Sequence, residues 1–223
     1  MRIGVSSYSF SQAMRDGRMT ILDVIPTAKG MGYEGVEIVK FCSDEEMREY
    51  APKLAAQSKE FEMPIIAYMV GADFLANGVA AQVETLKKEV EIAATLGAHR
   101  MRHDATGGKD ATGKAYTWEE ALPILAEGYG RVTEYAMGLG INTMIENHGY
   151  FAQDAARVKS LIEAVGNRNF GWLVDMGNFM CADETPVASV AIAAPLAAHA
   201  HAKDFHFKKK GDFVPKHGWF STR

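Results

Sequence analysis

Carboxylates and histidines recur in three segments of the C-terminal half of the chain, with a spacing that suits a divalent metal ion. Glu146 and His148 end one apolar run, Asp175 ends the next, and His199 and His201 lie in a third. Side chains two positions apart on a strand share one face, so Glu146 and His148 point together. Two carboxylates and an imidazole from three successive strands can converge on one cation. This donor set favours Mn, Mg, Co or Zn over a metal that prefers thiolates.

The segments that carry these residues belong to a repeating pattern of short apolar runs and longer runs of helical period. This alternation is typical of β/α units. It predicts strands at 2–7, 35–41, 64–70, 99–103, 141–146, 171–175 and 198–202. Helices are expected at about 20–31, 44–62, 79–96, 117–138, 153–165 and 185–197. Periodicity alone does not separate an open parallel sheet from a closed barrel.

The position of the polar residues favours the barrel. Charged and imidazole groups gather at the C-terminal ends of the expected strands, as His103 and Lys203 also do. An α/β barrel builds its active site from the loops at that end. We therefore expect an α/β fold of the TIM (β/α)8 type.

The same segments resemble a known family. Met144–His148, Leu173–Asn178 and His199–Asp204 are similar to the fifth, sixth and seventh strand motifs of the xylose-isomerase-like TIM barrels, and Gly35–Ile38 is similar to the second. That group includes sugar isomerases and epimerases, inosose dehydratases and apurinic endonucleases. The resemblance implies one divalent ion held by Glu146, Asp175 and His201. His201 is preferred over His199 because it precedes the Lys203–Asp204 pair.

The resemblance also implies an activity, which is the isomerisation or epimerisation of a sugar or sugar phosphate. A divalent ion would stabilise the enediolate that forms when a proton leaves the carbon next to the carbonyl. In similar epimerases, glutamates of strands five and eight form the acid/base pair, and Glu146 matches the first. His148 is an alternative proton carrier or a structural hydrogen-bonding residue.

Four further residues are expected to bind the substrate: Glu37, His103, Asn178 and Lys203. Glu37 alternates with apolar neighbours in its expected strand, so its side chain would face the mouth of the barrel. The alternative for Glu37 is a buried pair with an arginine such as Arg2 or Arg102.

One part of the family pattern is missing. The resemblance implies a fourth ligand, a glutamate from an eighth strand, but Asp212 is the only acidic residue after Asp204 and no strand or helix pattern follows. A seven-stranded barrel would leave two unpaired edges. We therefore expect a single barrel domain over residues 1–223 that lacks its eighth β/α unit and is C-terminally truncated.

Composition restricts the partners. The net charge of -4 provides no basic field to attract a phosphate backbone, so nucleic acid is not expected. The longest apolar stretch, 187–200, is too short for a membrane span and contains Pro195. The chain enters a strand at its first residues without a signal sequence, which predicts a cytoplasmic protein with a small sugar-like substrate. A homodimer is implied by the resemblance alone.

Three alternative functions remain open at this point. An inosose-dehydratase-like lyase would use the same metal site. A non-catalytic ligand-binding barrel is consistent with the missing glutamate. An apurinic endonuclease is less favoured, because it needs a cluster of several metals and the chain has seven histidines.

Overall fold

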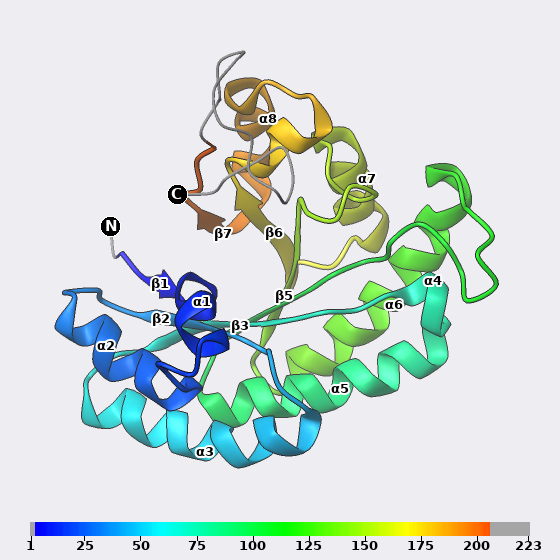
Figure 1. Ribbon diagram of the computed structural model, residues 1–223. Coiled ribbons are helices and arrows are strands. Elements are labelled where there is room, and N and C mark those ends of the chain that lie inside the picture. Colours follow the sequence, from blue (N-terminus) through cyan, green and yellow to red (C-terminus); the bar gives the residue numbers. More distant parts are fainter. Residues whose placement is uncertain (1–2, 206–223) are drawn as a thin grey trace.

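The computed structural model describes residues 3–205 as one curled parallel sheet with helices on its outer side (Figure 1). The strands follow one another in chain order: β1 (Val5–Ser6), β2 (Val36–Val39), β3 (Ile65–Val70), β4 (Arg100–His103), β5 (Asn142–Glu146), β6 (Phe170–Asp175) and β7 (Ala197–His201). Every neighbouring pair is parallel. β1 and β7 stand at the two ends of this order, so the described residues form a barrel that is open between them.

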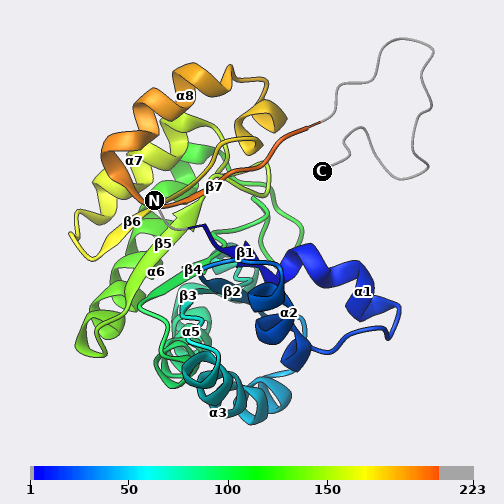
Figure 2. The same cartoon turned by 90° about the vertical axis from the view of Figure 1, so that its left-hand side faces the viewer.

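The helices that cover the sheet complete the β/α repeat (Figures 1 and 2). They are α1 (Ser11–Arg15), α2 (Val24–Gly30), α3 (Asp44–Glu60), α4 (Phe74–Asn77), α5 (Val79–Leu96), α6 (Trp118–Gly138), α7 (Ala155–Val165) and α8 (Pro186–Ala193). In the described part of the chain, four 3-10 turns accompany them: η1 (Ser7–Phe10), η2 (Ile21–Asp23), η3 (Asn178–Ala182) and η4 (Ala194–Leu196). The expected α/β barrel of seven strands is confirmed within residues 3–205.

Local sequence explains where the long helices begin and end. Ser43 accepts a hydrogen bond from the backbone N–H of Glu46, whose carboxylate accepts one from the backbone N–H of Ser43. Thr117 starts α6 with the same reciprocal capping arrangement. Gly97 ends α5 at a φ of 74°, which a residue with a side chain adopts at a cost. The predicted boundaries are therefore close to the observed ones for these helices.

The first strand is shorter than predicted, and two helices were not predicted. β1 covers only Val5–Ser6, because the chain turns into η1 after Ser6. The hydroxyl of Ser7 accepts a hydrogen bond from the backbone N–H of Val39, which occupies that donor at the end of β2. The short helices α1 and α4 lie in segments where no helical period is evident.

Two apolar layers hold the sheet. The larger core lies between the sheet and the helices and contains Trp172, Tyr68 and Tyr129, all with no exposed surface. A smaller cluster fills the interior of the barrel: Ala67, Met69, Met144 and Leu173, with Val39 and Ala198 against it. Met144 and Leu173 precede Glu146 and Asp175 by two residues on the same strand faces. The two carboxylates therefore stand directly above an apolar floor.

No helix within residues 3–205 is long and apolar enough to cross a membrane. The segment 206–223, for which no further β/α unit was expected, lies outside the described residues.

Candidate metal centre

Glu146, Asp175 and His201 meet at the C-terminal ends of three adjacent strands. Asp175 of β6 pairs in register with His201 of β7, and Glu146 of β5 pairs with Leu173 of β6. The Nδ1 atom of His201 lies 3.5 Å from Oε1 of Glu146 and 3.8 Å from Oδ2 of Asp175. One ligand atom from each residue lies within 4.8 Å of the other two. This arrangement can surround a single cation.

The backbone fixes the carboxylate of Asp175. Its Oδ1 atom accepts hydrogen bonds from the backbone N–H groups of Gly177 and Asn178, each at 2.9 Å. The side chain of Asn147 spans the same strand end, because its Oδ1 accepts from the Asp175 N–H and its Nδ2 donates to the Asp175 carbonyl. The second carboxylate oxygen, Oδ2, is left facing His201.

Glu146 is 6% exposed and sits between a cationic and an amide side chain. Its Oε2 atom forms an ion pair with Nη2 of Arg102 at 2.8 Å but no hydrogen bond of regular geometry. Its Oε1 atom accepts a bond of 3.3 Å from the Asn178 amide. Burial would raise the pKa of Glu146, but the positive charges of Arg102 and His201 outweigh burial and lower it to about 2. Glu146 is therefore an ionised, incompletely bonded carboxylate.

His201 is held from its other side by Glu37. A single oxygen of Glu37, Oε2, lies 2.9 Å from the Nε2 atoms of both His199 and His201. Burial would raise the pKa of Glu37, but these two imidazoles lower it to about 2. Burial also lowers the pKa of His201, but the carboxylates of Asp175, Glu146 and Glu37 raise it to about 11. The cluster attracts positive charge, which fits a site for a cation.

Asn178 and Lys203, both expected to bind substrate, lie beside this group. The Lys203 ammonium donates a hydrogen bond to Oδ1 of Asn178 and lies 3.6 Å from Oδ2 of Asp175. The Lys203 side chain is 29% exposed. An ammonium and an amide thus border the carboxylates from the side of β6 and β7.

His148, the second predicted proton carrier, lies further out. Its Nδ1 atom is 3.3 Å from Oδ1 of Asp104, and its side chain is 47% exposed. The Asp104 carboxylate raises the pKa of His148 above its ordinary value. Arg102 donates to the same oxygen of Asp104 at 3.1 Å. Glu146, Arg102, Asp104 and His148 therefore form one continuous chain of charged contacts.

Two of the expected substrate contacts are placed differently. His103 is fully buried on the outer face of β4, where its ring stacks on Tyr129 with centroids 4.2 Å apart. Burial lowers its pKa to about 4. Adjacent strand residues face opposite sides, so Arg102 faces the mouth and His103 does not. Glu37 is 3% exposed beneath two imidazoles, in place of the arginine pair or the open position considered above.

Sequence reasoning missed the position of Arg102 and Asp104 between the two predicted proton carriers. The alternation of side-chain direction along β4 could have placed Arg102 and His103 on opposite faces. In the structure, Arg100 and Arg102 are half-buried, whereas Met101 and His103 are fully buried.

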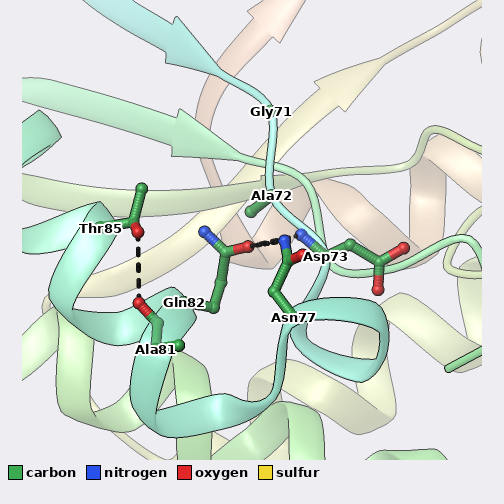
Figure 3. Close-up of a pocket in the computed structure, with 7 residues that line it drawn as sticks. All are labelled: Gly71, Ala72, Asp73, Asn77, Ala81, Gln82 and Thr85. Carbon is green, nitrogen blue, oxygen red and sulfur yellow. Dashed lines mark hydrogen bonds between the residues drawn. The ribbon is translucent and has the colours of Figure 1, made fainter. Parts of the chain in front are cut away.

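A hollow of about 570 Å³ lies elsewhere, between the end of β3 and the start of α5 (Figure 3). Its polar groups largely satisfy one another, because Oε1 of Gln82 accepts from the Asn77 amide at 2.6 Å and from the Asp73 backbone at 3.0 Å. The residues that line it are Gly71, Ala72, Asp73, Asn77, Ala81, Gln82 and Thr85, and none belongs to the metal-ligand group.

Solved structures share this fold. The probable 3-DHS dehydratase AsbF from Bacillus anthracis is 18% identical, with a TM-score of 0.75 over 92% of this chain and 74% of that one. A D-psicose 3-epimerase is 19% identical, with a TM-score of 0.72 over 90% and 72%. The 3-keto-D-glucoside 4-epimerase YcjR from E. coli is 14% identical, with a TM-score of 0.70 over 90% and 78%. No curated protein matches the chain.

A family model matches residues 25–221, which include every residue of the candidate centre. This match covers most of the sequence and agrees with the barrel and with the three strand-end motifs. The chain belongs to the xylose isomerase-like TIM barrel family.

Proposed function

We propose that the chain is a divalent-metal-dependent isomerase or epimerase of a sugar or sugar phosphate. The observation that carries the proposal is the group formed by Glu146, Asp175 and His201, whose ligand atoms lie within 4.8 Å of one another. When bound, a divalent ion supplies Lewis-acid polarisation of the hydroxyl and carbonyl oxygens of a sugar. Carboxylate and imidazole donors suit Mn, Mg, Co or Zn.

Two residues are proposed to move the proton. Glu146 is ionised and lies at the ligand group, where it can accept the proton from the carbon next to a carbonyl. His148 lies at the mouth with its Nδ1 directed at Asp104, which leaves Nε2 to exchange a proton with substrate. We therefore assign His148 to proton delivery and Glu146 to proton removal.

Substrate hydroxyls would be bound by Lys203 and Asn178. Both border the ligand group, and Lys203 retains exposed surface toward solvent. An ammonium with three donors also suits a phosphate group, so the substrate class includes sugar phosphates.

The test is isotope exchange in deuterium oxide. Protein loaded with Mn or Co is incubated with a panel of ketoses, and deuterium uptake at the carbon next to the carbonyl is followed together with product formation. Glu146→Gln should abolish uptake, and Glu134→Gln, a change on the exposed face of α6, should leave it unchanged. Absence of both exchange and turnover in the metal-loaded wild type would count against the proposal.

A dehydratase of an inosose-like polyol is the second candidate. The pair of His148 with Asp104 favours it, because loss of hydroxide requires an acid beside the leaving group. The same incubations separate the two reactions. A product lighter than the substrate by one water would indicate the lyase, and a product of unchanged mass the isomerase.

We also infer a cytoplasmic protein that acts on a small molecule. Cys42 and Cys181 are free thiols, which is the state that a reducing compartment maintains. The net charge of -4 argues against a nucleic-acid substrate. Tight, salt-sensitive binding to abasic DNA would contradict the exclusion of a nucleic-acid substrate.

A further inference from the structure

Glu37 binds His201 on the side opposite to the metal-ligand carboxylates. Its Oε2 atom is 2.9 Å from Nε2 of His201, while Nδ1 of the same ring faces Glu146 and Asp175. β2 and β7 are not neighbours in the sheet. The contact therefore joins two strands that are not hydrogen-bonded to each other.

The distances at the two nitrogens of His201 indicate two different kinds of contact. A separation of 2.9 Å is an ordinary N–H···O hydrogen bond. The separations of 3.5 and 3.8 Å on the Nδ1 side are too long for good hydrogen bonds. Two atoms that each lie about 2.1 Å from a shared ion are separated by roughly 3 to 3.5 Å. The 3.5 Å separation from Glu146 falls at the upper end of that range and the 3.8 Å separation from Asp175 lies just above it, whereas the Nε2 side has the spacing of a hydrogen bond.

Hydrogen positions follow from the chemistry of the carboxylate. An ionised carboxylate only accepts hydrogen bonds, so each imidazole that contacts Oε2 of Glu37 must carry its hydrogen on Nε2. A neutral imidazole with a hydrogen on Nε2 has its lone pair on Nδ1. In His201, Nδ1 faces the place where Glu146 and Asp175 converge, so the lone pair that Nδ1 gains when it gives up its hydrogen is directed there.

We propose that Glu37 is a positioning residue that fixes the ring orientation and tautomer of His201, so that Nδ1 is the metal ligand. The inference rests on the proposed metal site. Carboxylates that hold ligand histidines in this way typically change metal affinity 10- to 100-fold when mutated.

His199 completes the arrangement as a second donor to the same oxygen. Its ring packs edge-on against that of His201, with centroids 5.7 Å apart. Glu37 itself is flanked by Val36 and Ile38, which have no exposed surface, so its backbone is anchored in the outer core. The carboxylate is therefore held from its backbone and from two imidazoles at once.

A different role for the same three residues makes a distinct prediction. Glu37, His199 and His201 are themselves close enough to bind an ion. Both imidazoles would then have to lose the Nε2 hydrogen that their 2.9 Å contacts use. A second ion in that place would make Glu37 a ligand, and the stoichiometry of metal binding reveals it.

The first measurement needs no variant. Nitrogen NMR of the histidine rings in the wild-type protein loaded with Zn identifies which nitrogen of His201 carries hydrogen and which is bound to metal. We expect hydrogen on Nε2 and metal on Nδ1. The reverse assignment would overturn the inference while leaving the metal site intact.

The second measurement is calorimetric titration of Mn and Zn into wild type, Glu37→Gln and the matched control Glu34→Gln, whose side chain is exposed on the loop before β2. We expect one ion per chain in the wild type, a 10- to 100-fold weaker affinity for Glu37→Gln, and no change for Glu34→Gln. The NMR spectrum of Zn-loaded Glu37→Gln should show a mixture of His201 tautomers.

The possible outcomes distinguish failure of the proposed metal site from failure of the positioning role of Glu37. No metal binding by the wild type would refute the metal site itself. Normal affinity and an unchanged His201 tautomer in Glu37→Gln would refute the positioning role alone. Two ions per chain, one of them lost in Glu37→Gln, would also refute it, because Glu37 would then be a ligand.

Discussion

Loading the metal centre should release one proton from His201. The pKa of His201 is raised from 6.5 to about 11 in the metal-free protein, so the ring is an imidazolium at neutral pH. Glu146 and Glu37, with pKa values of about 2, are already ionised. An ion that binds Nδ1 must displace the hydrogen there, and His201 is the member of this group that has one to lose.

The sign and size of the pH effect follow directly. Because the pKa of His201 lies above the working range, its proton competes with the ion at every pH below about 11. Raising the pH by one unit should therefore tighten metal binding about tenfold, or about 1.4 kcal/mol, over a range of roughly pH 6 to 9. The effect should weaken as the pH approaches the pKa.

Calorimetric titration of Mn in two buffers with different ionisation enthalpies measures the number of protons released. We expect a value near one for the wild type. His99→Gln, a change in an exposed residue just before β4, is the matched control and should give the same value. Zero release, or affinity that falls with rising pH, would refute the assignment of His201 as a ligand.

Three further predictions concern stability. Gly128→Ala should destabilise the fold, because a Cβ there would lie 2.5 Å from the Phe74 ring. The cost of overpacking, about 1–3 kcal/mol, exceeds the gain in helix propensity of about 1 kcal/mol. A higher thermal midpoint for the variant would contradict this. Lys40→Met should cost about 3–5 kcal/mol in urea unfolding, since Glu89 would keep a buried charge without its ammonium partner. Addition of Glu89→Gln to that variant should recover part of the loss, and a further loss would count against the charge argument. The pKa of Glu37 is lowered from 4.5 to about 2, so its contribution to the free energy of unfolding is complete above pH 4.5 and should disappear as the pH falls toward 2. Urea midpoints measured across that pH range test this.

Much of the candidate centre was predictable because it depends on neighbouring strands. Glu146, Asp175 and His201 end three consecutive strands, and parallel strands with helical crossovers bring such ends to one edge. Alternation along each strand then decides which side chains face inward. Applied strictly to β4, the same rule gives Arg102 in place of His103.

The contact between Glu37 and His201 was beyond the reach of local pattern. The two residues are 164 positions apart and lie on strands that do not pair. Their meeting depends on how far the sheet curls, which is set by packing over the whole molecule. The length of β1 was equally unpredictable, because the apolar run around it continues into a 3-10 turn.

Within the described residues, β7 stands at one end of the strand order, so the part of the candidate centre on β7 should open more easily than the part on β5 and β6. Among the described strands, β7 is hydrogen-bonded to β6 alone, and its residues are half-buried or exposed. Strands with few buried contacts exchange their amide hydrogens through local fluctuations at a low free-energy cost. Fraying of this one strand would withdraw both imidazoles together, while Glu146 and Asp175 stay on β5 and β6. An ion bound to His201 would therefore hold β7 against β5 and β6. Release of the ion and local opening of β7 would then occur together.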